Sequence, residues 1–167
     1  DLPREYVAAR FYFSECFPET PENQAIVHAS IRSLAEECDV VVLGSGVRVD
    51  DHRDMTVGGI PRVHSLASLM RPETNLATQT AIIAGARAFV GTYGGFSYLA
   101  PLCGVDAVAV YSRREFFAYH LDYAQQMFDE VQGGSLTVVD VRMRSLFRHL
   151  GAVEPSPSTS AGGVLPR

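Results

Sequence analysis

The stretch from Ala86 to Tyr111 carries the residue pattern best suited to binding an anion. Gly91-Thr92-Tyr93-Gly94-Gly95 interrupts an apolar run, and apolar side chains at helical spacing follow from Phe96. A glycine turn that leads into a helix directs backbone N–H groups and the positive end of the helix dipole at one point, which favours a phosphate. The alternative is that the glycines only permit a tight turn between strand and helix.

Other polar residues occur at positions where they could assist such a site. Arg113-Arg114 follow the next apolar run, and two guanidinium groups can clamp a phosphate, although a solvated pair is equally ordinary. Ser14-Glu15 follow the first apolar run. Asn75 and Gln79 lie one turn apart near a predicted helix start, where they either cap the helix and face solvent or face a ligand.

Two further motifs favour a structural interpretation. Gly44-Ser45-Gly46 follows a strand, but the third glycine of a dinucleotide fingerprint is replaced by Val49, and no helix pattern follows. Asp50-Asp51-His52-Arg53-Asp54 could bind Mg²⁺ or Mn²⁺ through carboxylates. We expect a solvated surface loop there, and no metal site.

Composition excludes several classes of function. The 167 residues include 14 Lys+Arg, all of them arginine, so the chain lacks the lysine of a P-loop and the lysine of a Schiff-base enzyme. The formal net charge of −5 provides no basic excess for nucleic acid. No apolar run approaches the length of a transmembrane helix, and no signal-peptide pattern is present.

The 3 cysteines form neither a disulfide framework nor a zinc pattern, which favours a reducing, cytoplasmic location. The chain begins with Asp1 and opens almost directly into a strand-like segment, so it is expected to be a piece of a longer protein.

Strands and helices alternate along the chain. Apolar runs predict six strands, at 6–13, 40–43, 62–66, 88–90, 105–110 and 136–139. Helices are predicted from Thr20-Pro21-Glu22, from Pro72 to Asn75, after Gly95, over 116–131 and over 142–150. This order predicts a Rossmann-like three-layer α/β/α fold with a six-stranded parallel sheet in the order 3-2-1-4-5-6.

The predicted sheet brings the candidate residues together. The first and fourth strands are neighbours, so Ser14-Glu15 and Gly91–Gly95 meet at the switch point where such sheets bind ligands. The loop at Tyr111–Arg114 lies beside them. The aromatic stripe of the helix over 116–131 is expected to be core. Residues 1–153 form one domain, and 154–167, rich in proline, serine and glycine, is predicted to be a disordered tail.

The segment from Asn75-Leu76-x-x-Gln79-Thr80 through Ala86 to Val105 resembles the C-terminal half of a GT-B glycosyltransferase, heptosyltransferase-like in layout. The resemblance covers roughly residues 6 to 150. It implies a nucleotide-diphosphate sugar as donor substrate, no covalently bound cofactor and no metal. The diphosphate is expected near Thr92, Tyr93, Gly94, Gly95, Phe96 and Ser97, and the base or ribose near the loop 69–75.

The chain departs from that family at several positions. Its turn has no acidic residue, Tyr98 stands near the place of a histidine, and the lysine used on phosphate is missing. The resemblance also implies a partner, an N-terminal acceptor domain that this chain lacks and that usually supplies the catalytic base. The acceptor would be a glycan or a cell-surface polysaccharide precursor. Arg113 or Arg114 would supply charge, and Glu15 would contact the sugar.

Two alternatives remain open from the sequence. The chain could be a non-catalytic α/β module in which the turn only packs a helix on a strand and the aromatic helix docks a partner domain. It could also belong to another transferase acting on polysaccharide precursors, such as a pyruvyltransferase.

Overall fold

The computed structural model describes residues 2–44, 52–115 and 118–143. Its strands are β1 (Tyr6–Arg10), β2 (Tyr12–Phe13), β3 (Asp39–Val42), β4 (Arg53–Asp54), β5 (Val63–Ser65), β6 (Ala88–Thr92), β7 (Ala107–Tyr111) and β8 (Leu136–Asp140). Its helices are α1 (Pro21–Glu37), α2 (Asn75–Ala84), α3 (Gly95–Leu102) and α4 (Ala118–Glu130). Single 3₁₀ turns, η1 (Ala67–Leu69) and η2 (Val141–Met143), complete the set.

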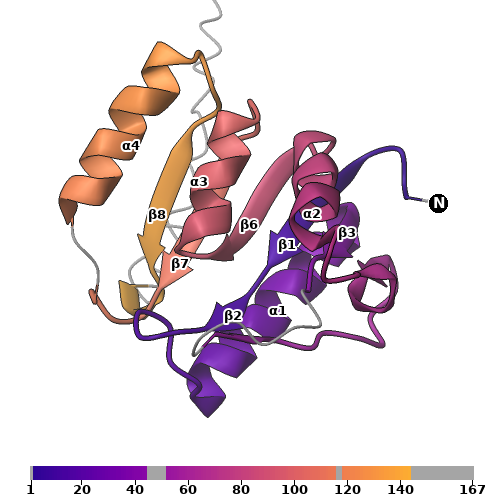
Figure 1. Cartoon of the computed structure of the whole chain (residues 1–167). Helices are drawn as coiled ribbons and strands as arrows, with labels where there is room; N and C mark the ends of the chain where they lie inside the picture. The colour runs from indigo at the N-terminus through magenta and orange to yellow at the C-terminus, as the bar shows by residue number, and fades with distance from the viewer. Residues whose placement is uncertain (1, 45–51, 116–117, 144–167) are drawn as a thin grey trace, which may run out of the picture.

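The main sheet confirms the predicted fold class and strand order. Six strands run parallel in the order β5-β3-β1-β6-β7-β8, which is 3-2-1-4-5-6 for the predicted strands. Helices α2, α3 and α4 lie on one face of the sheet and α1 lies on the other (Figure 1). The fold is therefore a Rossmann-like α/β/α arrangement with the switch point between β1 and β6.

The first helix begins where its sequence predicts. The hydroxyl oxygen of Thr20 accepts a hydrogen bond from the N–H of Asn23 at 3.1 Å, and Pro21 opens the first turn. Val27 and Ile31 are fully buried against the sheet. The helix thus fixes the path of the chain from β2 to β3.

The first predicted strand is divided in two. β1 ends at Arg10, and β2 leaves the main sheet to pair antiparallel with β4. The expected surface loop at Asp50–Asp54 is therefore wrong for Arg53 and Asp54, which form β4, while Asp50 and Asp51 lie outside the described residues. The sequence did not predict this strand because its side chains are charged, and its pairing with β2 is made by backbone groups.

The aromatic stripe of α4 is not core. Tyr119, Tyr123 and Val131 are 62%, 65% and 55% exposed, whereas Phe128 on the other side of the helix is 5% exposed. Leu121 and Ala124 share the side of Phe128 and pack on the core. The prediction of a buried stripe was wrong because both sides of α4 carry apolar residues at helical spacing.

Two predictions concern residues outside the described part of the chain. Of the predicted last helix, Arg142 and Met143 belong to η2, and residues 144–150 lie outside the described residues, as does the predicted tail 154–167. In the part that is described, no helix has the length and apolarity needed to cross a lipid bilayer.

A substitution at Gly91 tests how closely β1 and β6 approach each other at the centre of the sheet. A Cβ built on Gly91 would overlap the carbonyl oxygen of Arg10 in the neighbouring strand. We therefore expect Gly91→Ala to lower the free energy of unfolding by about 1–3 kcal/mol, the usual cost of overpacking, in urea titrations. The control is Gly58→Ala, where a Cβ meets nothing within 4 Å. Equal stability of the two variants would contradict this account of the central pair.

Candidate functional site

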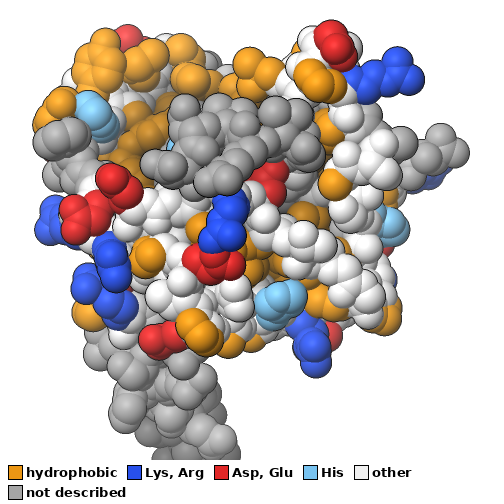
Figure 2. Space-filling view, turned by 60° about the horizontal axis from the view of Figure 1, so that its bottom comes forward, with side chains coloured by type: hydrophobic (Ala, Val, Ile, Leu, Met, Phe, Trp, Pro, Cys, Tyr) orange, Lys and Arg blue, Asp and Glu red, His pale blue; other side chains and the backbone are white. Residues whose placement is uncertain are grey.

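Three loops meet at the carboxyl edge of the sheet, as the strand order predicts. The carbonyl oxygen of Cys16 accepts hydrogen bonds from the N–H groups of Ser112 and Arg113, both at 2.9 Å. The thiol of Cys16 lies 3.6 Å from the carbonyl oxygen of Tyr93 and donates to it. The loop after β1 and β2 is thus tied to both the β6 turn and the β7 loop. On the view that brings this edge forward, arginine and acidic side chains are interspersed (Figure 2).

The side chain of Thr92 is used by the fold. Its hydroxyl accepts from the N–H of Tyr12 at 3.1 Å and donates to the carbonyl of Tyr12 at 3.0 Å. The phenol of Tyr12 in turn donates to the carbonyl of Tyr93 at 3.3 Å. Thr92 is 1% exposed. These bonds hold the end of β6 against β2 and leave the Thr92 hydroxyl engaged within the protein.

Gly94 and Ser97 form the cap of α3. The N–H of Gly94 donates to the Ser97 hydroxyl at 3.1 Å, and that hydroxyl donates to the Gly94 carbonyl at 2.7 Å. Ser97 is fully buried, and a Cβ on Gly94 would overlap the Tyr12 hydroxyl. The closeness of Tyr12 therefore requires glycine at position 94, independently of any ligand.

Gly95 and Phe96 are the first two residues of α3. The first N–H groups of a helix have no partner within it, and those of Gly94 and Ser97 are used in the cap. A Cβ on Gly95 would meet nothing within 4 Å, so the space beside this residue is open. Of the residues predicted near the phosphate, Thr92, Tyr93 and Ser97 have hydroxyls that are hydrogen-bonded within the protein, whereas Gly95 and Phe96 have only backbone groups to offer at the start of α3.

The hydroxyl of Tyr93 is paired with that of Tyr98, which stands on α3 one turn away. Burial raises the pKa of Tyr93, and the hydrogen bond to Tyr98 raises it further. Burial likewise raises the pKa of the Cys16 thiol. Both shifts favour the protonated, neutral form of these groups.

A buried arginine lies beside the first turn of α3. Arg10, at the end of β1, is 9% exposed, and its guanidinium carbon lies 4.0 Å from the centre of the Phe96 ring. One terminal nitrogen donates to Gln79 Oε1 at 2.8 Å and the other pairs with Asp54 Oδ1 at 3.2 Å. Within the described residues, the Nε of Arg10 is buried and has no hydrogen-bond partner.

The predicted pair Asn75 and Gln79 belongs to this arginine cluster. Gln79 is 1% exposed, and its amide nitrogen donates to the side-chain oxygen of Asn75. Gln79 therefore does not face solvent, and its side-chain oxygen accepts a hydrogen bond from Arg10. The alternative that this pair faces a ligand stays a prediction. On the same helix, Ile82 and Ile83 are buried with Gln79, whereas Leu76 is 66% exposed.

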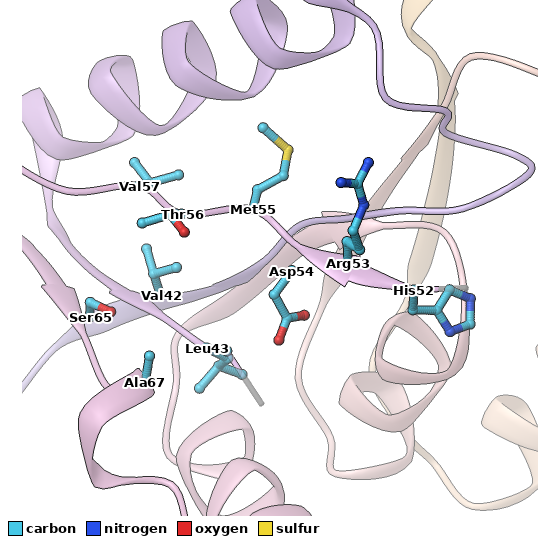
Figure 3. A pocket seen from close by; sticks show the side chains of 11 residues that line it. Val42, Leu43, His52, Arg53, Asp54, Met55, Thr56, Val57, Ser65 and Ala67 are labelled. Atoms are coloured by element: carbon cyan, nitrogen blue, oxygen red, sulfur yellow. The ribbon is translucent and has the colours of Figure 1, made fainter. Parts of the chain in front are cut away.

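A cavity of about 410 Å³ opens where β3 and β5 end (Figure 3). Its walls come from the ends of these strands, from the segment through β4 and from η1. The lining residues are Val42, Leu43, Gly44, His52, Arg53, Asp54, Met55, Thr56, Val57, Ser65 and Ala67. Asp54 joins the cavity to Arg10, and Arg10 joins it to the first turn of α3. The cavity wall and the first turn of α3 are thus connected through the side chain of Arg10.

Arg113 and Arg114 lie elsewhere on that edge. Both are exposed, and Arg113 lines a separate cavity of about 160 Å³ with Thr20, Asn23 and Arg142. Glu15 is also exposed, and Ser14 bonds to the Cys16 thiol. The sequence argument placed these loops correctly but missed Arg10 and the cavity at β3 and β5. A charged residue in an apolar strand run was the available signal for Arg10.

Among residues 2–44, 52–115 and 118–143, no group of three or more His, Cys, Asp or Glu side chains is arranged to hold a metal ion. In comparisons with known proteins, no family model, no curated protein and no solved structure matches this chain.

Tyr12 gives a test of the packing around the turn. Burial raises its pKa from 10.0 to about 12, chiefly by desolvation. Because Tyr12 holds its proton more tightly in the folded state than in the unfolded state, the protonated phenol stabilises the fold. This contribution to the free energy of unfolding is fully present below pH 10 and is lost as pH rises towards 12. We expect Tyr12→Phe to cost about 1 kcal/mol at pH 7 through the lost hydrogen bond, and to decline less steeply than the parent above pH 10.

The measurement is urea unfolding between pH 7 and pH 12. Tyr123→Phe, at a 65% exposed position, is the matched control and should follow the parent at every pH. Parallel decline of Tyr12→Phe and the parent above pH 10 would show that the Tyr12 phenol does not titrate as described.

Proposed function

We propose that this chain binds a nucleoside diphosphate sugar and acts as the donor-binding half of a glycosyltransferase. The observation that supports this most is the position of Arg10, which contacts both the cavity wall at Asp54 and the first turn of α3 at Phe96. A cavity for a nucleoside next to amides for a diphosphate, at the switch point of a parallel sheet, is the arrangement that such a ligand needs.

The nucleoside occupies the cavity at the ends of β3 and β5. Its walls are largely apolar, with Val42, Met55 and Val57 available to contact a base. The Asp54 carboxylate and the Ser65 hydroxyl supply polar groups for ribose hydroxyls. The cavity volume of about 410 Å³ lies within the range of small-molecule sites.

The diphosphate lies in front of Gly95 and Phe96. Their N–H groups and the α3 dipole stabilise the charge that develops when the bond between the sugar carbon and the diphosphate oxygen breaks. Arg10, held at the adjoining wall, adds positive potential. The acceptor, and the base that removes its proton, come from an acceptor domain outside this chain, as the resemblance to GT-B enzymes implies.

A non-catalytic interaction module is the second candidate. It is favoured by Gly91 and Gly94, both of which the packing requires without a ligand, and by the exposed apolar residues on α4. This reading predicts no nucleotide affinity, so direct titration separates the two candidates.

Calorimetric titration with UDP, GDP and ADP tests the proposed function. We expect at least one of them to bind at millimolar concentration or tighter. Ala67→Phe, which fills the cavity beside η1, should weaken that binding at least tenfold, because the nucleoside loses its space. Ala25→Phe on the exposed surface of α1 is the matched control. Absence of binding by all three nucleotides, with the chain folded, would overturn the proposal.

Position 95 tests the diphosphate separately from the nucleoside. Gly95→Glu places a carboxylate in open space at the amino end of α3, where it repels a diphosphate but suits the helix dipole. We expect at least tenfold weaker binding of the diphosphate and unchanged or higher stability. Gly95→Gln has the same size without the charge and should bind more tightly than Gly95→Glu. Equal affinity of the two variants would place the diphosphate elsewhere.

A further inference from the structure

Helix α4 has a second apolar side besides the one that packs on the core. Its members are exposed and follow one another every four residues: Tyr119, Tyr123, Met127 and Val131. The N–H of Val131 donates to the carbonyl of Met127 at 3.1 Å, so the helical path continues to Val131. Side chains at this spacing are neighbours and form one ridge on the helix surface. We call these four residues the α4 ridge.

The α4 ridge lies at the other end of the sheet from the cavity. β8 is the last strand in the sheet order, and α4 lies at that end of the molecule, whereas β3 and β5 beside the cavity are at the opposite end (Figure 1). Phe128, on the other side of α4, is buried and holds the helix to the core. A partner bound to the ridge therefore leaves the cavity accessible.

The area of the α4 ridge suits a weak complex. A fully buried aromatic side chain removes roughly 150–250 Å² from water, and Tyr119 and Tyr123 are 62% and 65% exposed. Two copies of the ridge thus offer several hundred Å² of apolar surface, below the roughly 1,200 Å² of a stable standard interface. We therefore expect association through this surface at micromolar or higher concentration.

The polar residues beside the ridge are complementary between its two ends. His120 is exposed in the first turn of α4, and Glu130 is exposed in the last. If a second copy lies antiparallel with its centre at residue 125, positions equally far from that centre come opposite each other. His120 then meets Glu130 of the other copy, where the imidazole N–H can donate to the carboxylate and has the opposite charge when protonated. Tyr123 meets Met127, a favourable sulfur–aromatic pair.

Other occupants fit the charges of α4 less well. In a parallel pair each residue lies opposite its own counterpart, so the two Glu130 carboxylates would repel each other. Asp122, Asp129 and Glu130 give α4 three acidic residues, and the helix contains no arginine or lysine. A surface of anionic lipid would therefore repel it.

We propose that the α4 ridge binds the same ridge of a second copy of this chain, antiparallel, in a twofold-symmetric dimer. Such an interface is self-complementary, so each contact, including the pair of His120 with Glu130, occurs twice. The inference goes beyond the proposed nucleotide function and does not depend on it.

Sedimentation equilibrium of the full chain, from about 10 μM to about 1 mM, tests the dimer. We expect a monomer–dimer equilibrium that Tyr123→Glu weakens at least tenfold, because it places a carboxylate in the apolar centre of the contact. Gln125→Glu makes the same change in charge at an exposed position of α4 outside the ridge, and should dimerise as the parent does. A chain that stays monomeric throughout, or a dimer that Tyr123→Glu leaves intact, would overturn the proposal.

Charge reversal tests the antiparallel direction. His120→Glu sets two carboxylates opposite each other, and Glu130→Arg sets a guanidinium opposite the imidazole, so each variant alone should dimerise about threefold more weakly than the parent. An equimolar mixture of the two variants should dimerise better than either alone. One of its two contacts is then a carboxylate–guanidinium pair, and the other is the native pair. Asp122→Arg is the matched control and should not rescue His120→Glu. A mixture no more dimeric than its components would exclude the antiparallel dimer.

Discussion

A guanidinium charge buried at the end of β1 is the constraint on which the carboxyl edge depends. Leaving such a charge without partners costs several kcal/mol, so three separate parts of the chain must bring groups to it. Asp54 comes from β4, Gln79 from α2 and the Phe96 ring from α3. The same contacts fix the wall of the cavity, the rotation of α2 and the first turn of α3.

The sequence alone does not show which glycines of the turn after β6 are required by packing and which leave open space. Gly94 is required because the Tyr12 hydroxyl lies against it, and Gly91 because the backbone of Arg10 does. Gly95 faces open space, so packing does not explain it. Of the three glycines in this turn, only Gly95 has open space beside it, and the proposed diphosphate site is therefore placed at this end of α3.

The sequence predicted the sheet well because its strands are short apolar runs separated by helix signals and turns. The strand order was then taken from the Rossmann-like arrangement of alternating strands and helices, and the structure has that order. Which side of a helix is buried was harder to predict. Helix α4 has apolar residues on two sides. Helix α2 buries Gln79 while Leu76 is exposed, because Gln79 is hydrogen-bonded to Arg10, which is distant in sequence. The cavity lined by Asp54, Ser65 and Ala67 was not predicted, because one of its walls is the segment through β4, whose pairing with β2 the sequence did not indicate.

Arginine, rather than another cation, suits the position at β1. Its two terminal nitrogens reach Gln79 and Asp54 in different directions while the plane stacks on Phe96, a set of contacts that a single ammonium group does not span. One guanidinium group thus connects the cavity wall at Asp54 with the first turn of α3 at Phe96.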